Sequence, residues 1–283
     1  MSLLLEKALK KAQNLTPSNP LGIGITPYLM AGDPNPETTL RRMLQLAKGG
    51  VDVIELGVPF SDPMADGPII QAAGQRALEQ GMNLTKVLRL TAQFRAQNQD
   101  TPILLMSYLN PLLKYGLESF LRDAQSSGIN GLILPELPWR ESSSFQEKLK
   151  KYAPELTLIP MVAQTSSQDH LKSLSQAEKG FAYVLSRHGI TGGDATILDS
   201  TLEYIRSLKE ELTLPLYVGF GIHSPNQVEK LAGVCQGVIV GSALVQKYAH
   251  LDALDLPHEE KLKKEEEIAT WLISLRQPTL KEE

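Results

Sequence analysis

Cysteine is almost missing from this sequence of 283 residues, and neither sign of charge is in large excess. The single cysteine, Cys235, allows no disulfide within the chain, which is typical of a protein of the reducing cytoplasm. We interpret Cys235 as a packing residue. The 28 lysines and arginines against 32 aspartates and glutamates give a net charge of −4. This balance argues against a nucleic-acid partner or a membrane surface.

Long apolar runs and the common cofactor motifs are also missing. No run approaches the ~20 apolar residues of a membrane span, and the first residues, MSLLLEKALKKAQ, alternate like an amphipathic helix rather than a secretory signal. The five histidines have no metal-ligand spacing, and neither a Cys-x-x-Cys pair nor a Walker A motif occurs. We therefore expect a cytoplasmic protein that holds no metal and no nucleotide.

Short β-rich runs that alternate with helical periodicity are what the sequence does contain. The expected strands are 23–30, 51–57, 103–108, 131–134, 156–162, 181–185, 216–218 and 237–240. Eight parallel strands joined by helical crossovers close naturally into a (β/α)8 TIM barrel of the α/β class. Extra helices are expected at both ends, including the charged stretch HEEKLKKEEEIATWLISL. No linker divides the chain, so we expect one domain over residues 1–283.

The second expected strand ends in an unusual loop, LGVPFSDPMADGP. In TIM barrels, the active site lies at the C-terminal ends of the strands. Alternation along the strand directs Glu55 into the barrel if Ile54 and Leu56 face the helices. Partial desolvation there would raise the pKa of Glu55 and suit it for proton transfer. The loop beyond the strand contains Asp62 and Asp66. Either one alone is typical of a turn, but the two together favour a functional role for at least one of them.

Glycine-rich turns follow the last two expected strands, in VGFGIHS and IVGSALV. Backbone N–H groups at such turns and at helix N-termini bind phosphate, and this is the common phosphate site of TIM barrels. We therefore expect a phosphate site at the turns Gly219-Phe220-Gly221 and Gly241-Ser242. Gly192, in the loop after the sixth strand, could form a further side of this phosphate site. The residues alone thus indicate a barrel enzyme that uses carboxylates on a small phosphorylated substrate.

Five stretches together resemble the tryptophan synthase alpha chain in order and spacing: PYLMAGDP, IELGVPFSDPMADGP, YVLSRHGITG, GFGI and GSALV. The resemblance covers roughly residues 5 to 250, and IELGVPFSDPMADGP is highly specific. It implies a (β/α)8 lyase that splits indole-3-glycerol phosphate into indole and glyceraldehyde 3-phosphate by a retro-aldol reaction. It also implies an α2β2 heterotetramer, in which a beta chain that carries pyridoxal phosphate uses the indole, and no cofactor in the alpha chain itself.

The same resemblance assigns roles to individual residues. It implies that Glu55 transfers a proton at the indole carbon that bears the side chain, and that Asp66 binds the indole N–H. Tyr183 and Thr191 match substrate-binding positions, with Thr191 on a mobile loop over about 186–197. The phosphate binders that it implies are Gly192, Gly221, Gly241 and Ser242.

Three positions depart from the usual pattern of the family. Met30 stands where threonine is usual, Glu136 where aspartate is usual, and His188 gives the loop after the sixth strand an uncommon sequence. Three alternatives stay open at this point: another phosphosugar barrel, a non-catalytic activator of a beta chain, and a free-standing lyase that releases indole.

Overall fold

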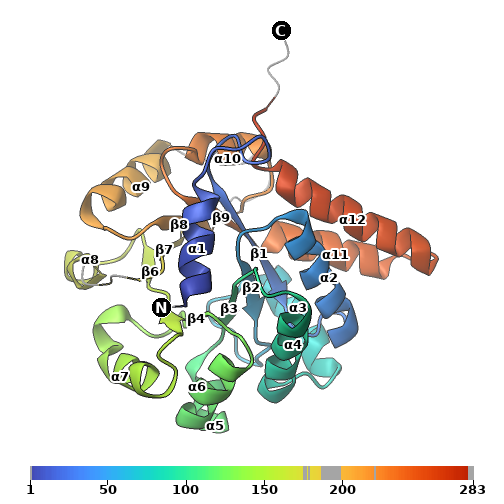
Figure 1. Cartoon of the computed structure of the whole chain (residues 1–283), viewed down its shortest axis with the longest axis horizontal. Coiled ribbons are helices and arrows are strands. Elements are labelled where there is room, and N and C mark those ends of the chain that lie inside the picture. The colour runs from blue at the N-terminus through green and yellow to red at the C-terminus, as the bar shows by residue number, and fades with distance from the viewer. Residues whose placement is uncertain (1, 175–176, 178, 186–198, 220, 280–283) are drawn as a thin grey trace.

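Parallel strands curl into a closed barrel, and helices pack around its outside (Figure 1). The computed structural model describes residues 2–174, 177, 179–185, 199–219 and 221–279. The strands in this part of the chain are β1 (Gly24–Met30), β2 (Ile54–Gly57), β3 (Ile103–Met106), β4 (Gly131–Ile133), β5 (Thr157–Leu158), β6 (Met161–Ala163), β7 (Ala182–Leu185), β8 (Leu216–Gly219) and β9 (Gly237–Val240).

The order of the strands shows how the barrel closes. Hydrogen-bonded neighbours follow the order β5-β4-β3-β2-β1-β9-β8-β7-β6, and only Ile159 and Pro160 separate its two ends, β5 and β6, in the chain. Proline has no backbone N–H to give to a ladder, so Pro160 interrupts the strand expected over 156–162. β5 and β6 are therefore two pieces of one strand, and the predicted (β/α)8 barrel is confirmed.

Helices connect successive strands and cover the barrel. They are α1 (Leu3–Ala12), α2 (Pro36–Gly49), α3 (Pro68–Glu79), α4 (Leu84–Gln97), α5 (Leu109–Tyr115), α6 (Leu117–Ser126), α7 (Ser143–Tyr152), α8 (Gln168–Leu174), α9 (Asp199–Glu211), α10 (Pro225–Leu231), α11 (Ser242–Ala253) and α12 (His258–Ser274), with the 3-10 helix η1 (Trp139–Glu141). None of the helices in the described ranges is long and apolar enough to cross a membrane.

Side-chain caps fix the starts of two helices. The Asn35 side chain accepts a hydrogen bond of 2.8 Å from the Thr38 N–H at the start of α2, and Ser224 and Gln227 form the capping box of α10. The helices at the two ends of the chain, α1 and α12, are also present as predicted.

The periodicity of the sequence does not predict α3 and α5. The buried face of α3 consists largely of small residues, Ala73, Gly74 and Ala77 beside Ile70, so its apolar stripe is weak. α5 has only seven residues, which is too short for a periodic pattern to stand out. Each is the first helix after a strand, so both begin on the side of the barrel where the active site is expected.

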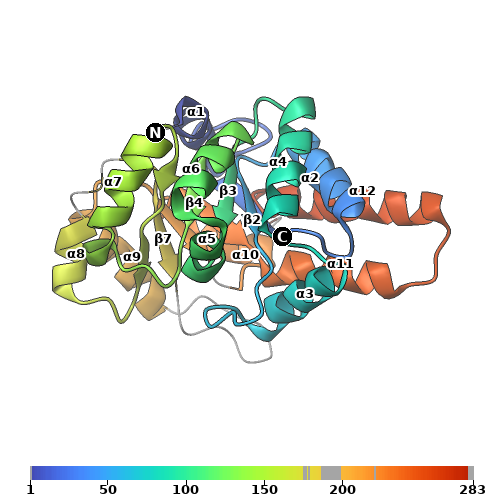
Figure 2. The same ribbon diagram turned by 90° about the horizontal axis from the view of Figure 1, so that it is seen from below.

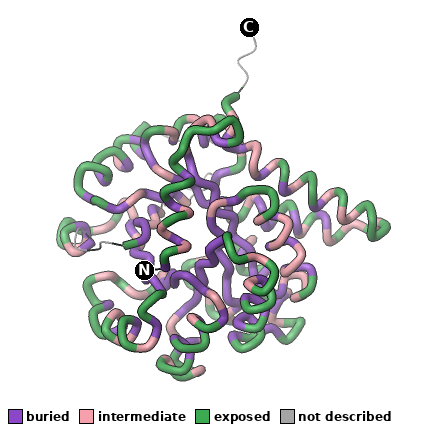
Figure 3. Tube along the Cα trace, in the orientation of Figure 1, coloured by how far each residue is buried: buried purple, intermediate pink, exposed green. Residues whose placement is uncertain are grey.

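Apolar side chains from the strands pack against one another inside the barrel. The strands are buried in the centre of the molecule, while the helices expose their outer faces (Figure 3). One end of the barrel is closed by α1, whose Leu5 and Leu9 join the inner cluster of apolar side chains. α1 and the loop that leads into α3 lie at opposite edges of the molecule in Figure 2. Ligands therefore have to enter from the end opposite α1.

Three tyrosines fill the interior because each lies over a glycine of the neighbouring strand. A Cβ atom added to Gly57 would come within 2.0 Å of the Tyr28 hydroxyl oxygen. Added Cβ atoms would likewise come within 2.6 Å of the Tyr183 ring at Gly219, and within 2.2 Å of the Tyr217 ring at Gly237. Glycine is required at these three positions by close approach rather than by backbone conformation.

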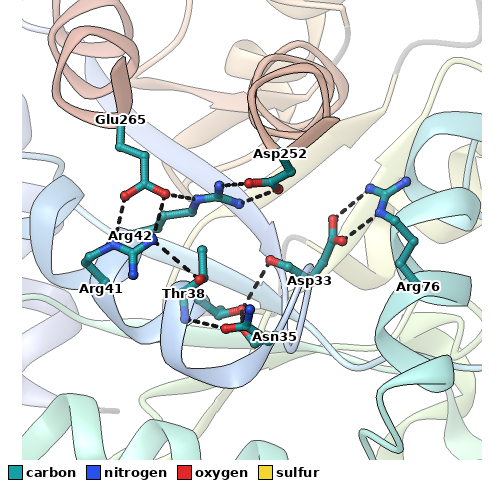
Figure 4. A network of polar contacts seen from close by, with 9 residues as sticks. Asp33, Asn35, Thr38, Arg41, Arg42, Arg76, Asp252 and Glu265 are labelled. Atoms are coloured by element: carbon teal, nitrogen blue, oxygen red, sulfur yellow. Dashed lines mark hydrogen bonds and ion pairs between the residues drawn. The ribbon is translucent and has the colours of Figure 1, made fainter. Parts of the chain in front are cut away.

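Helices α11 and α12 run side by side and extend beyond the barrel (Figures 1 and 2). A network of buried ion pairs joins them to α2 (Figure 4). The Arg42 guanidinium, 2% exposed, donates to Glu265 of α12 at 2.9 Å and also pairs with Asp252 of α11. Glu265 accepts a second bond of 2.8 Å from Arg41. This network fixes α11, the helix that begins at Ser242, relative to the barrel.

Candidate active site

Glu55 lies on β2 with its side chain inside the barrel and only 1% exposed. Burial, together with the negative charge of Asp66, raises the pKa of Glu55 to about 8, while a hydrogen bond with the Tyr183 hydroxyl acts in the opposite direction. Tyr183 reaches Glu55 from β7, across the barrel. The carboxyl group of Glu55 is therefore protonated at neutral pH and can act as an acid.

Asp66 lies in the loop between β2 and α3 and is half-buried. The Tyr108 hydroxyl donates a hydrogen bond of 3.2 Å to Asp66 Oδ2 and accepts one of 3.0 Å from the Ala65 N–H. Gln71 holds the main-chain carbonyl of Asp66 at 2.8 Å. Burial raises the pKa of Asp66 to about 6, and the bond from Tyr108 counteracts part of the rise. At neutral pH Asp66 is mostly ionised, in contrast to Glu55.

Tyr108 is a functional candidate that the sequence reasoning missed. Tyr108 is 3% exposed. The centroid of its ring lies 5.3 Å from the centroid of the Phe60 ring. Tyr108 therefore contacts the loop of Asp66 at two residues, Phe60 and Asp66 itself. The expected strand 103–108 includes Tyr108 as its last residue. Leu104 and Met106 belong to the interior of the barrel, and the same alternation that directs Glu55 inward applies to Tyr108.

Glu136, one of the departures from the family pattern, supports this arrangement from a neighbouring loop. Its carboxylate accepts a hydrogen bond from the Leu109 N–H, at the first residue of α5. A negative charge at a helix N-terminus is stabilising. Glu136 thus fixes the start of α5 directly after Tyr108. Asp62, by contrast, is exposed and bonds only locally, with Ser61 Oγ at 2.5 Å from its Oδ2.

The loops expected to bind phosphate follow two adjacent strands. β8 and β9 pair in parallel, so the turns after them lie next to each other. Gly221 adopts a φ of +51°, in the left-handed region that favours glycine. Gly241 is the N-cap of α11, and Ser242, its first residue, is exposed. The unpaired N–H groups of the first turn of α11 are available there for an anion.

Some of the predicted site residues lie outside the described residues. These are Thr191, Gly192, His188 and the whole loop over 186–197. In the part of the chain that the structure describes, no group of three or more His, Cys, Asp or Glu side chains could hold a metal ion.

Barrel and site together define a (β/α)8-barrel enzyme with a protonated and an ionised carboxyl group at the C-terminal ends of its strands. Comparison with known proteins identifies the family. The model of the tryptophan synthase alpha chain family matches residues 20–274. The chain belongs to this family, whose members are lyases that cleave indole-3-glycerol phosphate in tryptophan biosynthesis.

Individual relatives support this assignment. The tryptophan synthase alpha chain of Geobacillus stearothermophilus is 42% identical over 252 residues, 89% of this chain and 93% of the relative. A solved alpha subunit from Legionella pneumophila str. Paris superposes with a TM-score of 0.83 at 33% identity, covering 97% of this chain and 98% of that chain. A chain of the α2β2 tryptophan synthase complex of Pyrococcus furiosus reaches a TM-score of 0.80 at 31% identity, covering 89% and 98%.

Proposed function

We propose that Glu55 and Asp66 carry out the cleavage of indole-3-glycerol phosphate to indole and glyceraldehyde 3-phosphate. The observation that supports this most directly is the pair of carboxyl groups whose pKa values, about 8 and about 6, lie on opposite sides of neutrality. Such a pair supplies a proton donor and a negative charge in one site. Both are required when an indole ring must first be protonated and then released.

The reaction follows from these two charge states. Protonated Glu55 gives its proton to the indole carbon that bears the glycerol side chain, and Asp66 accepts a hydrogen bond from the ring N–H, where positive charge develops. The Glu55 carboxylate then takes the proton of the hydroxyl group on the adjacent side-chain carbon. The carbon–carbon bond breaks as that hydroxyl becomes the aldehyde, and its electron pair restores the neutral indole.

The remaining predicted residues bind and orient the substrate. Gly221, Gly241, Ser242 and Gly192 would hold the phosphate through backbone N–H groups and one hydroxyl, while Tyr183 and Thr191 would contact the rest of the substrate. Tyr108 acts as a positioning residue for Asp66. This chain would need no cofactor for these steps.

A beta chain is the partner that we propose, in an α2β2 assembly like that of the P. furiosus relative. The beta chain, which carries pyridoxal phosphate in this family, would use the indole. The loop from Pro59 to Gly67 is the contact surface that we expect, because it connects the molecular surface with Asp66. Met64 in this loop is 87% exposed, although methionine is apolar. Pressure on this loop would shift Asp66 towards its aligned position.

The test is an assay of indole release from indole-3-glycerol phosphate, with and without an added beta chain. We expect slow turnover by the chain alone and stimulation of at least ~10-fold by a beta chain. Glu55→Gln should lose all but ~1% or less of the rate, whereas the exposed Glu118→Gln should keep it.

The alternatives give different results in the same assay. High turnover that a beta chain leaves unchanged would favour a free-standing lyase. No turnover by the complex would favour a non-catalytic activator. Stimulation that survives substitution of Pro59 and Asp62 would place the contact elsewhere.

A further inference from the structure

Tyr28 has a hydroxyl group inside the barrel that the proposed reaction does not yet use. Tyr28 lies on β1 and pairs in register with Glu55 on β2. Its ring crosses the inner face of Gly57, where an added Cβ would come within 2.0 Å of the hydroxyl oxygen. This places the hydroxyl beside Gly57, two residues beyond Glu55 on β2, towards the end where the loop of Asp66 lies.

The hydroxyl of Tyr28 is almost free of partners. Its one hydrogen-bond contact among the described residues is the Met30 Sδ, at 4.0 Å. A thioether is a weak acceptor, so the proton of Tyr28 remains available to a better one. Met30 is one of the departures from the family pattern, and its thioether makes this availability possible.

The second group without a good hydrogen-bond partner is the carboxyl group of Glu55. Its Oε2 atom is buried and has no hydrogen-bond partner among the described residues. An uncommitted donor and an unpartnered oxygen thus stand on adjacent strands inside the same barrel. A buried polar group without a partner is costly, so the two atoms indicate a ligand that satisfies both. A hydroxyl group does so, because it accepts one hydrogen bond while it donates another.

We propose that Tyr28 is a further catalytic residue, whose hydroxyl donates a hydrogen bond to the substrate oxygen that becomes the aldehyde. This inference rests on the proposed reaction, in which the same hydroxyl of the substrate donates its proton to Glu55. As that proton leaves, negative charge grows on the oxygen, and the Tyr28 hydrogen bond strengthens. Tyr28 itself neither gains nor loses a proton in the step.

The electrostatics of the site keep Tyr28 in the donor form. Burial raises its pKa well above the usual value, and the negative charges of Asp66 and Glu55 add to the rise. The phenol therefore stays protonated throughout the pH range in which the carboxyl groups titrate. A phenolate, which could only accept, does not form.

The test compares Tyr28→Phe with Tyr217→Phe. Tyr217 is a matched control because its hydroxyl is also buried inside the barrel and lacks a partner among the described residues. It lies at the opposite end, 2.7 Å from where a Cβ would be on Gly24, beside Ala12 of α1. We expect Tyr28→Phe to lower kcat/KM for indole-3-glycerol phosphate by at least ~10-fold and Tyr217→Phe to change it less than ~2-fold.

A second ligand separates hydrogen bonding from packing. Indole-3-propyl phosphate keeps the ring and the phosphate but has no hydroxyl groups, so its Kd should be the same for wild type and Tyr28→Phe. In a Glu55→Gln background, which leaves the substrate intact, Tyr28→Phe should weaken binding of indole-3-glycerol phosphate alone. Equal loss for both ligands, or unchanged kcat/KM, would overturn the inference.

A measurement on a chain that keeps the tyrosine covers the case in which Tyr28→Phe does not fold. With 3-fluorotyrosine at position 28 in the Glu55→Gln background, the 19F resonance should shift with indole-3-glycerol phosphate and much less with indole-3-propyl phosphate. Equal shifts would count against the inference. The proposed function fails separately, if Glu55→Gln keeps the wild-type rate.

Discussion

The rate of indole formation should depend on pH along a bell-shaped curve, because the two carboxyl groups must be in opposite states. Asp66 has to be ionised, so kcat/KM should rise as pH increases through its pKa of about 6. Glu55 has to be protonated, so kcat/KM should fall as pH increases through its pKa of about 8. The profile of kcat/KM reports the pKa values of the free enzyme.

The two pKa values set the shape of this curve. The maximum should lie near pH 7, midway between them. One pH unit beyond either pKa the active fraction has dropped about tenfold, so kcat/KM should be about a tenth of its maximum at pH 5 and at pH 9. The assay is indole release at subsaturating substrate in buffers of constant ionic strength.

The acid limb needs a control, because a phosphate monoester also titrates near pH 6. Tyr108→Phe supplies one. It removes the hydrogen bond that holds the pKa of Asp66 down, so the acid limb should move to higher pH while the ionisation of the substrate stays the same. An acid limb that does not move would assign it to the substrate. If kcat/KM of the wild type does not fall at alkaline pH, the assignment of Glu55 as the acid is refuted.

Two further predictions concern stability. The unfolded chain releases the Glu55 proton above its ordinary pKa of 4.5, whereas the folded chain holds it up to about 8, so stability should fall with rising pH between these values by up to ~1.4 kcal/mol per unit. In urea unfolding, Glu55→Gln should therefore be more stable than wild type at pH 8 and similar to it at pH 4.5. A difference in the free energy of unfolding that is the same at both pH values would contradict this. Glu265→Ala leaves the buried Arg42 with Asp252 as its one remaining carboxylate in the network and should lower the free energy of unfolding by ~1–3 kcal/mol. The exposed Glu266→Ala should change it by less than ~0.5 kcal/mol, and equal effects would show that the network of Figure 4 adds nothing.

The barrel could be predicted because its signals are local. Each strand is a short β-rich run, and several crossover helices carry their own cap or apolar stripe, as at Asn35 and Ser224. The interruption at Pro160 and the helices α3 and α5 were not predictable in the same way. α3 packs with small side chains and α5 is short, so contacts with the rest of the barrel determine both.

The candidate site was predictable only in part. Alternation along β2 sufficed to place Glu55 inside the barrel, because only the strand itself is needed for that argument. Tyr108 became visible as the partner of Asp66, and Tyr28 as the neighbour of Glu55 in register, only when β1, β2 and β3 were placed side by side. Their roles depend on which side chains face each other across strands, and a single sequence does not contain this information.

The tyrosine–glycine pairs inside the barrel also constrain how the sequence can diverge. Gly57 cannot gain even a methyl group while Tyr28 is present, and the same holds for Gly219 with Tyr183 and for Gly237 with Tyr217. A smaller residue at the tyrosine position, in turn, would leave a void over the bare glycine backbone. Each pair is therefore expected to evolve as a unit, with the two positions covarying among homologues. Substitutions that change the shape of the interior are thus expected in pairs, at a tyrosine and at the glycine that it covers on the adjacent strand, rather than at single positions.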